Sequence, residues 1–396
     1  MSSSISPEPC SKCPHRRTEP PKGQTIPAST EPTAGPLARY RGCLTAGAAG
    51  DALGAPVEFL DRAAIARQYG EGRIRDLAPA YGRTGAITDD TQMTLFTAEG
   101  LLRAHVRGRM RGIGPDYAGI TAHAYLRWLH TQGGQPGQRV ELDGWLIGHP
   151  ALFHRRAPGN TCLQALTALR DVGERADNDS KGCGGVMRVA PVGLYYARWI
   201  GEPAERAAQA FATTAEIAGI THGHPTGQLT AGFLAVVIAE LACGEDLSAA
   251  VASAKAELRG HRHPEETLAA VAAAEDLAAT RPADPAALPE LGRGWIAEEA
   301  LAIALYCALS APNLEEALIM AVNHDGDSDS TGAITGNILG TVYGEEAIPQ
   351  RWRDDLELRE VIREMAEDLY GFPDWKVSEY GDEAVNDYYW GRYPGY

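Results

Sequence analysis

Long stretches of this chain place alanine and leucine at helical spacing, and the pattern dominates from about residue 37 onward. Alternation of β-branched residues, which would mark strands, is scarce. Connectors rich in proline and glycine separate the apolar stretches. We predict helices over 37–53, 90–107, 115–130, 203–221, 226–243, 246–259, 264–280, 295–309, 331–343 and 355–370. The pattern therefore predicts an all-α fold.

The two ends of the chain differ from this helical middle. Residues 1–36 contain eight prolines and almost no apolar periodicity, so we expect a disordered or extended arm. Residues 37–371 form the predicted domain. Residues 372–396 hold eight of the 28 aromatic residues, and we expect this tail to pack on the domain because aromatic side chains bury much area. A stacking wall for a nucleobase is the alternative for the tail.

Glycines fall at every fourth position in the helix that follows residue 331, at Gly332, Gly336, Gly340 and Gly344. A helix face that carries only hydrogens lets another backbone approach closely. We favour tight core packing over direct ligand contact for this face.

Composition limits the classes of partner. The 36 basic residues against 52 acidic ones give a formal charge of −16, the wrong sign for binding nucleic acid through its phosphates. We identify no apolar run of about 18 residues that would span a bilayer, so no membrane partner is expected. The first residues lack the apolar stretch of a secretory signal, and we expect a cytoplasmic protein.

Seven cysteines scattered through a long chain do not resemble a disulfide framework, so we expect reduced thiols. Cys10, Cys13 and His15 could form half of a zinc site, but no second pair with suitable spacing follows them.

Acidic residues gather in two short runs about 235 residues apart. NHDGDSDSTG (323–332) carries Asp325, Asp327 and Asp329, and TDDT (88–91) carries Asp89 and Asp90. Like charges this close repel, so cations, water or hydrogen-bond donors must compensate them. The oxygen ligands favour Mg²⁺, Mn²⁺ or Ca²⁺ over zinc. The alternative is a solvated acidic turn and an ordinary helix N-cap.

A calcium-binding EF-hand is excluded by its own spacing rule. That loop needs glycine at position six and glutamate at position twelve, and counting from Asp325 these places hold Ser330 and Gly336. One six-coordinate Mg²⁺ or Mn²⁺, or a pair of ions that share both acid runs, fits better.

Three further segments carry candidate chemistry. GDALGAPVEF (50–59) contains Asp51 and Glu58, and we assign Asp51 a structural capping role. NDSKGCGGVMRVAP (178–191) is a glycine-rich loop able to wrap a phosphate, although it does not match the P-loop GxxxxGK[ST]. THGHPTG (221–227) places Pro225 at a first helical position, with His222 and His224 before it, so ligand contact and a structural role both stay open for the two histidines.

Five motifs occur together in one order: GDALGAPVEF, TDDTQM, G-C-G-x-x-M-R, THGHPTG and GDSDSTG. In this combination the chain resembles the ADP-ribosylglycohydrolase family over most of residues 37–345. The resemblance implies a single compact, orthogonally packed helical domain with a binuclear metal cleft that holds two Mg²⁺ or Mn²⁺ ions. It also implies hydrolysis of the bond between the ribose C1″ of ADP-ribose and a protein side chain, so the expected partner is an ADP-ribosylated protein or a small ADP-ribose conjugate.

The resemblance assigns roles residue by residue. The expected metal ligands are Thr88, Asp89, Asp90, Asp327, Asp329 and Ser330. The expected substrate-binding residues are Ser180, Gly182, Cys183, Gly184, Met187 and His222. Many members have threonine in place of Ser330 and asparagine in place of Cys183. Serine keeps the hydroxyl oxygen but cysteine does not keep the amide, so Cys183 is the real chemical departure.

The acidic residue expected to act as the catalytic base is Glu58 or Asp89. Glycosidic cleavage passes through a state that resembles an oxocarbenium ion, and carboxylates near the anomeric carbon stabilise its positive charge. The glycine loop, THGHPTG and GDSDS are shared with the arginine-directed branch of the family, so we expect ADP-ribosyl-arginine as the substrate. A serine or O-acyl linkage, a non-catalytic ADP-ribose binder and a metal-dependent phosphoesterase are the alternatives.

Overall fold

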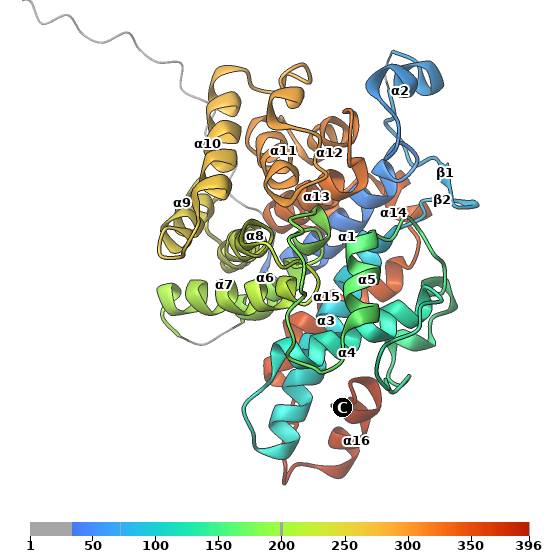
Figure 1. The fold of residues 1–396 in the computed structure, drawn as a ribbon, viewed down its shortest axis with the longest axis vertical. Helices are drawn as coiled ribbons and strands as arrows, with labels where there is room; N and C mark the ends of the chain where they lie inside the picture. Colours follow the sequence, from blue (N-terminus) through green and yellow to red (C-terminus); the bar gives the residue numbers. More distant parts are fainter. Residues whose placement is uncertain (1–33, 72, 199–200, 396) are drawn as a thin grey trace, which may run out of the picture. The chain divides into compact units, whose positions relative to one another are not determined.

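Helices are the main secondary structure in the part of the chain that this computed structural model describes, residues 34–71, 73–198 and 201–395. Within these residues sixteen α-helices build the fold (Figure 1), and the only strands are the antiparallel two-residue pair β1 (Pro79–Ala80) and β2 (Arg83–Thr84). The prediction of an all-α fold is confirmed. The arm predicted over 1–36 lies outside the described residues up to position 33, and so do Cys10, Cys13 and His15.

Ten α-helices correspond to predicted stretches: α1 (Pro36–Gly54), α3 (Asp89–Arg111), α4 (Tyr117–Thr131), α7 (Pro203–Gly219), α8 (Pro225–Cys243), α9 (Leu247–Leu258), α10 (Glu265–Thr280), α11 (Ala297–Ser310), α13 (Ser328–Tyr343) and α15 (Arg359–Gly371). The pattern does not predict the six shorter helices α2 (Arg62–Tyr69), α5 (Asn160–Ala168), α6 (Ala190–Ala197), α12 (Leu314–Val322), α14 (Gln350–Asp355) and α16 (Glu383–Arg392). Short 3₁₀ turns are η1 (Leu146–Gly148), η2 (Pro150–Leu152), η3 (Cys183–Gly185), η4 (Leu288–Leu291), η5 (Glu345–Ala347) and η6 (Phe372–Asp374).

Two differences between the predicted and the observed helix boundaries change the description of the fold. The stretch 355–370 is not one helix, because Leu358 adopts a left-handed φ of 55° and separates α14 from α15. Helix α13 begins at Ser328 rather than at 331, so Asp329 and Ser330 belong to its first turn. Carboxylates are favourable in a first helical turn, where the free N–H groups point outward.

Helices α1 and α13 lie side by side (Figure 1) because glycines on both of them remove the side chains between the backbones. A Cβ atom at Gly336 would lie 2.0 Å from the carbonyl oxygen of Ala46, and one at Gly332 would lie 2.4 Å from that of Gly50. Close packing is therefore confirmed as the role of the glycine face. The contact continues to Gly54, where a Cβ would lie 2.4 Å from the Ser328 oxygen, and so brings the end of α1 against the start of α13.

Helix α8 forms the apolar centre of its neighbourhood and contacts α6, α7, α9, α10, α11 and α13. Among the described residues it is the one helix whose length and composition would allow it to cross a membrane, and 89% of its apolar window is buried inside the protein. The expectation that the chain has no apolar stretch long enough to span a bilayer is therefore wrong for α8. Its uniform hydrophobicity is explained by burial on all sides.

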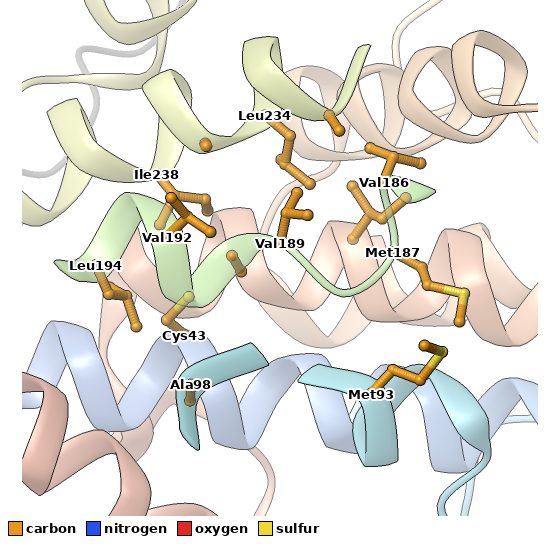
Figure 2. Packing of buried hydrophobic residues seen from close by; sticks show 14 of the residues in the cluster. Cys43, Met93, Ala98, Val186, Met187, Val189, Val192, Leu194, Leu234 and Ile238 are labelled. Atoms are coloured by element: carbon orange, nitrogen blue, oxygen red, sulfur yellow. The ribbon is translucent and has the colours of Figure 1, made fainter. Parts of the chain in front are cut away.

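The segment that carries Met187 lies in the hydrophobic core. Figure 2 shows residues 186–194 between α8 on one side and α1 and α3 on the other, with Val189 near Leu234. Met187 and Met93 of α3 belong to the same buried cluster. Burial of this segment fixes the position of the glycine-rich turn that precedes it.

Part of the aromatic tail is anchored on the helices. Tyr393 is buried, and its hydroxyl hydrogen-bonds to the carboxylate of Asp368. Arg103 of α3 donates a 2.9 Å hydrogen bond to the carbonyl of Pro394. Tyr380 and Tyr388, by contrast, are exposed.

Candidate functional site

One cavity of about 180 Å³ collects most of the residues that the sequence singles out. Its lining includes Glu58, Asp89, Asp90, Gly182, Cys183, Gly184, Met187, His222, Asp327, Asp329 and Ser330. Thr88 and Ser180 do not line it. These residues come from the turn after α1, the start of α3, the turn η3, the segment before α8 and the start of α13. The two distant acid runs therefore meet, as the sequence predicts.

Asp51 organises the start of α3. Its carboxylate accepts the N–H of Thr88 at 3.0 Å and the N–H of Thr91 at 3.1 Å. Thr88 is the N-cap, and its hydroxyl accepts the N–H of Asp90 at 3.3 Å. The structural role predicted for Asp51 is confirmed, and the side chains of Asp89 and Asp90 are left to face the cavity.

Buried carboxylates crowd together at the centre of the cavity. Oxygen atoms of Glu58, Asp327 and Asp329 all lie within 4.8 Å of one another, and the three side chains are buried. Oε2 of Glu58 and Oδ1 of Asp90 are buried without any hydrogen-bond partner. Burying a carboxylate oxygen without a partner is costly, so these two atoms are candidates to coordinate a cation.

Burial and mutual repulsion disfavour the charged forms of the carboxyl groups in this cluster. Four of these acids have a raised pKa: Glu58, Asp89, Asp90 and Asp327. Burial is the largest cause for each of them, and the negative charge of Asp329 is the second largest. Burial also raises the pKa of Asp329, while hydrogen bonds from groups that include Thr88 oppose that shift. Thr88 therefore acts on the cluster although it does not line the cavity.

No lysine or arginine is among the residues that line this cavity. The nearby guanidinium groups are already engaged: Arg156 pairs with Glu357, and Arg188 lies 4.2 Å from the ring centroid of Tyr125. The cluster thus offers hard oxygen atoms with nothing cationic to neutralise them. This donor set fits a hard divalent cation such as Mg²⁺ or Mn²⁺.

Asp325 does not join the other acids of its run. Arg62 donates to it twice, from the backbone N–H at 2.6 Å and from Nε at 3.0 Å, and burial of this ion pair is incomplete. Of the three aspartates in the second run, only Asp327 and Asp329 enter the cavity.

The glycine-rich turn lies directly over His222. A Cβ atom at Gly184 would lie 3.2 Å from Cε1 of His222 and 3.0 Å from Sγ of Cys162, so any side chain there would require these neighbours to shift. Nδ1 of His222 pairs with the Thr221 hydroxyl at 2.8 Å. Burial, and then the charge of Arg188, lowers the pKa of His222 to about 3, so the ring is neutral.

His224 has a structural role instead. It is the N-cap of α8, and its Nδ1 accepts the N–H of Thr226 at 3.1 Å. Pro225 occupies the first helical turn, as predicted. Of the two roles left open by the sequence, the structural one therefore applies to His224. His222, by contrast, lines the cavity.

The cysteine of the turn contacts the acid cluster. Sγ of Cys183 donates to Oδ2 of Asp327 at 2.7 Å, and the thiol carries a pKa raised by burial and by the charge of Asp327. Ser330 donates from Oγ to Sδ of Met187 at 3.6 Å. The turn and the start of α13 are therefore in direct side-chain contact.

Five lining residues are not found by sequence reasoning: Ala157, Gly159, Thr161, Cys162 and Trp295. The N–H of Gly159 donates to Oδ2 of Asp89 at 3.4 Å, and Thr161 pairs with Ser180 at 3.2 Å, which places Ser180 just outside the cavity. The available signal was the Pro-Gly turn ahead of α5, where Ala157 has a left-handed φ of 51°.

A larger cavity of about 610 Å³ lies elsewhere, around Arg73, Arg75 and Glu316. It contains none of the predicted site residues, and Arg75 already pairs with Glu316 at 2.5 Å. We therefore place the chemistry in the smaller, acid-lined cavity.

Comparison with known proteins agrees with this geometry. The profile of the family described as ADP-ribosylglycohydrolase matches residues 32–376. An uncharacterised protein of Archaeoglobus fulgidus is 32% identical over 84% of this chain and 96% of its own length. The ADP-ribosyl-[dinitrogen reductase] glycohydrolase of Rhodospirillum rubrum is 27% identical over 80% of this chain and 91% of its own.

Two further comparisons point the same way. The ADP-ribosylarginine hydrolase Tri1 of Serratia proteamaculans is 25% identical over 88% of this chain and 84% of its own length. A solved structure described as an ADP-ribosylglycohydrolase-related protein complex superimposes with a TM-score of 0.60 at 26% identity, covering 85% of this chain and 98% of that one. The chain belongs to the ADP-ribosylglycohydrolase family of enzymes.

Proposed function

We propose that this protein is a metal-dependent hydrolase that removes ADP-ribose from modified protein side chains, with arginine as the preferred linkage. The observation that carries the proposal is the buried carboxylate cluster, built from distant segments, in which Oε2 of Glu58 and Oδ1 of Asp90 have no partner. Acids arranged in this way are useful around cations and at a developing positive charge. We also propose a cytoplasmic location.

The residues that would hold two Mg²⁺ or Mn²⁺ ions are Thr88, Asp89, Asp90, Asp327, Asp329 and Ser330. All six are buried, and each offers a carboxylate or hydroxyl oxygen. When bound, the ions supply Lewis acidity that polarises ribose hydroxyl groups and acidifies water.

Glu58 is our candidate for the group that accepts a proton from the attacking water. Its Oε2 has no partner, whereas an oxygen of Asp89, the second candidate, already accepts the N–H of Gly159. As the bond at C1″ breaks, the ribose gains positive charge, and the neighbouring carboxylates stabilise it.

The diphosphate of ADP-ribose would lie against the glycine-rich turn. The N–H groups of Gly182 and Cys183 already donate to Ser180 and to the carbonyl of Trp295, and those of Val186 and Met187 donate to the carbonyl of Cys183, so the anion would meet the amide of Gly184. His222, neutral beneath the turn, offers a ring nitrogen without adding charge. Met187 supports Ser330 from the core.

The arginine linkage is supported by three features. The glycine turn, THGHPTG and GDSDS resemble the arginine-directed branch, and one relative is named an ADP-ribosylarginine hydrolase. An acid-lined site also suits a cationic guanidinium group.

A test of the proposal offers arginine-linked and serine-linked ADP-ribosyl peptides in parallel, in Mg²⁺ and again in Mn²⁺. We expect faster release of ADP-ribose from the arginine peptide in both metals. Faster release from the serine peptide would overturn the linkage, and binding of ADP-ribose without any release would favour a non-catalytic binder. Glu58→Gln should lose more activity than Asp325→Asn, whose side chain is turned to Arg62.

A further inference from the structure

Two aromatic rings stack at the rim of the acid-lined cavity. Phe59 follows Glu58 directly in the chain and is 72% exposed, and Trp295 lines the cavity and is 41% exposed. Their centroids lie 6.0 Å apart with 18° between the planes. Large apolar side chains are usually buried, so an exposed aromatic pair beside a site indicates a surface for a ligand.

Backbone hydrogen bonds hold the two segments that carry these rings. The carbonyl of Trp295 accepts the N–H of Cys183 at 3.2 Å, which ties the backbone of Trp295 to the glycine-rich turn. Phe59 is held by the turn that closes α1, where the N–H of Val57 donates to Gly54 at 2.8 Å. The stacked pair therefore lies between the glycine-rich turn and Glu58.

Charges around the pair are mainly negative. A second cavity of about 400 Å³ adjoins the rings, and among its lining residues Glu58, Asp61 and Asp325 are acidic while Arg293 is the one basic residue. Arg62 neutralises Asp325. Two acids, Glu58 and the exposed Asp61, then remain against the exposed Arg293, so acidic residues outnumber basic ones by one in this part of the rim.

We propose that Phe59 and Trp295 form the docking face for the guanidinium group of the modified arginine and so set the linkage preference; this inference rests on the proposed function. The scissile bond must lie within reach of Glu58, and the target side chain must point from there to solvent because it belongs to another protein. Phe59 is the next residue and faces solvent at this point.

The chemistry of the rings distinguishes the two linkages. A ring face carries negative charge density and holds a planar guanidinium by stacking and cation–π attraction. A serine-linked conjugate presents a neutral ether oxygen on a short side chain and gains no such attraction. The rings therefore favour arginine through the leaving group, without touching the nucleotide.

The test compares Phe59→Leu with the wild-type enzyme. Leucine keeps an apolar side chain but removes the ring, and the exposed position makes misfolding no concern. We expect kcat/KM for the arginine-linked peptide to fall by about tenfold. The dissociation constant of free ADP-ribose should stay within about twofold, and Phe59→Tyr should restore kcat/KM. The matched control is Phe153→Leu, which removes another exposed phenylalanine, outside the cavity lining.

Three results would overturn the inference. They are an unchanged kcat/KM in Phe59→Leu, an equal loss on the serine-linked peptide, and a parallel loss of affinity for free ADP-ribose. In Trp295→Leu, weaker binding of free ADP-ribose would assign that ring to the nucleotide and overturn its part in the docking face. Failure of the wild-type enzyme to release ADP-ribose from either peptide would instead overturn the proposed function.

Discussion

Arg156 and Glu357 form a buried ion pair, with Nη2 of Arg156 2.9 Å from Oε1 of Glu357, across 201 positions of the chain. The pair holds the backbone just ahead of the acid run in α3. Arg156 donates to the carbonyl of Ile87 at 2.9 Å, and Glu357 accepts the N–H of Ile87 at 3.2 Å. The carbonyl of Arg156 accepts the N–H of Asp89 at 3.2 Å. The Arg156–Glu357 ion pair, which has no part in the chemistry, thus positions Asp89, a candidate metal ligand.

Replacing Glu357 with glutamine should weaken metal binding as well as stability. The change leaves Arg156 buried without its partner, which costs about 3 kcal/mol, and it frees the segment that orients Asp89. We expect the dissociation constant for Mn²⁺, measured by calorimetry, to rise about tenfold. Arg156→Lys, a milder change, should move it in the same direction.

Glu99→Gln is the matched control for this pair. Glu99 is equally buried on α3 and pairs with Arg103 and Arg127, away from the acid-lined cavity. It should lose similar stability and keep the Mn²⁺ affinity of the wild type. Equal weakening of Mn²⁺ binding in both variants would show that general loosening of α3 is responsible.

Asp329→Asn should separate repulsion from metal binding. Asp329 is the charge that acts most strongly on the pKa of four neighbouring acids, so its neutralisation relieves the cluster when metal is absent. In EDTA we expect a Tm at or above that of the wild type. In saturating Mg²⁺ the variant should lack the wild-type gain, which mass action sets at about 2.7 kcal/mol at a hundredfold excess over Kd.

Asp325→Asn should behave differently although it changes an acid of the same run. Its carboxylate pairs with Arg62, so the metal-dependent gain in Tm should remain. Loss of that gain in Asp325→Asn would contradict the division of the run between the site and the surface.

The metal-dependent gain in stability should widen as pH rises from about 5 to about 8. In EDTA the folded protein holds protons on acids whose pKa values are raised, led by Glu58, whereas the unfolded chain releases them near pH 4. The metal-free protein therefore loses stability as pH increases through this window, while cation binding strengthens because fewer protons compete. Thermal scans with Mg²⁺ and with EDTA at several pH values measure the difference; a gain that shrinks with pH would be inconsistent with a carboxylate metal site.

Gly336→Ala should destabilise the protein by about 3 kcal/mol, because the new Cβ would lie 2.0 Å from the backbone oxygen of Ala46 and force α1 and α13 apart. Denaturant unfolding measures the loss. Gly391→Ala in α16 is the control, since a Cβ there meets nothing within 4 Å, and alanine should stabilise the helix by roughly 0.5 kcal/mol. Equal effects at both positions would refute the packing role.

The sequence predicted the long helices because their apolar spacing is regular over many residues. The same reasoning failed for α6, whose residues are apolar on every face because it lies between α8 and α3, so no period remains to detect. It also failed for α12, which has only nine residues. The break at Leu358 depends on a left-handed backbone conformation, which a leucine in the sequence does not predict.

The candidate site was predictable where acidic residues cluster in short runs of sequence, as at Asp89 and Asp329. Trp295 was missed because its place beside Cys183 depends on a backbone contact between segments more than 100 residues apart. Asp325 shows the converse: the sequence groups it with the other acids, and only the fold reveals its pairing with Arg62. Tertiary contacts decide which member of a run reaches the cavity.

The central claim, metal-dependent cleavage at the ribose C1″, is tested most directly by identifying the products from an arginine-linked ADP-ribosyl peptide by mass spectrometry. With Mn²⁺ or Mg²⁺ we predict intact ADP-ribose and unmodified arginine peptide, no turnover in EDTA, and no turnover by Asp329→Asn. Appearance of AMP with a phosphoribosyl group left on the peptide, or undiminished release of ADP-ribose in EDTA, would contradict the account.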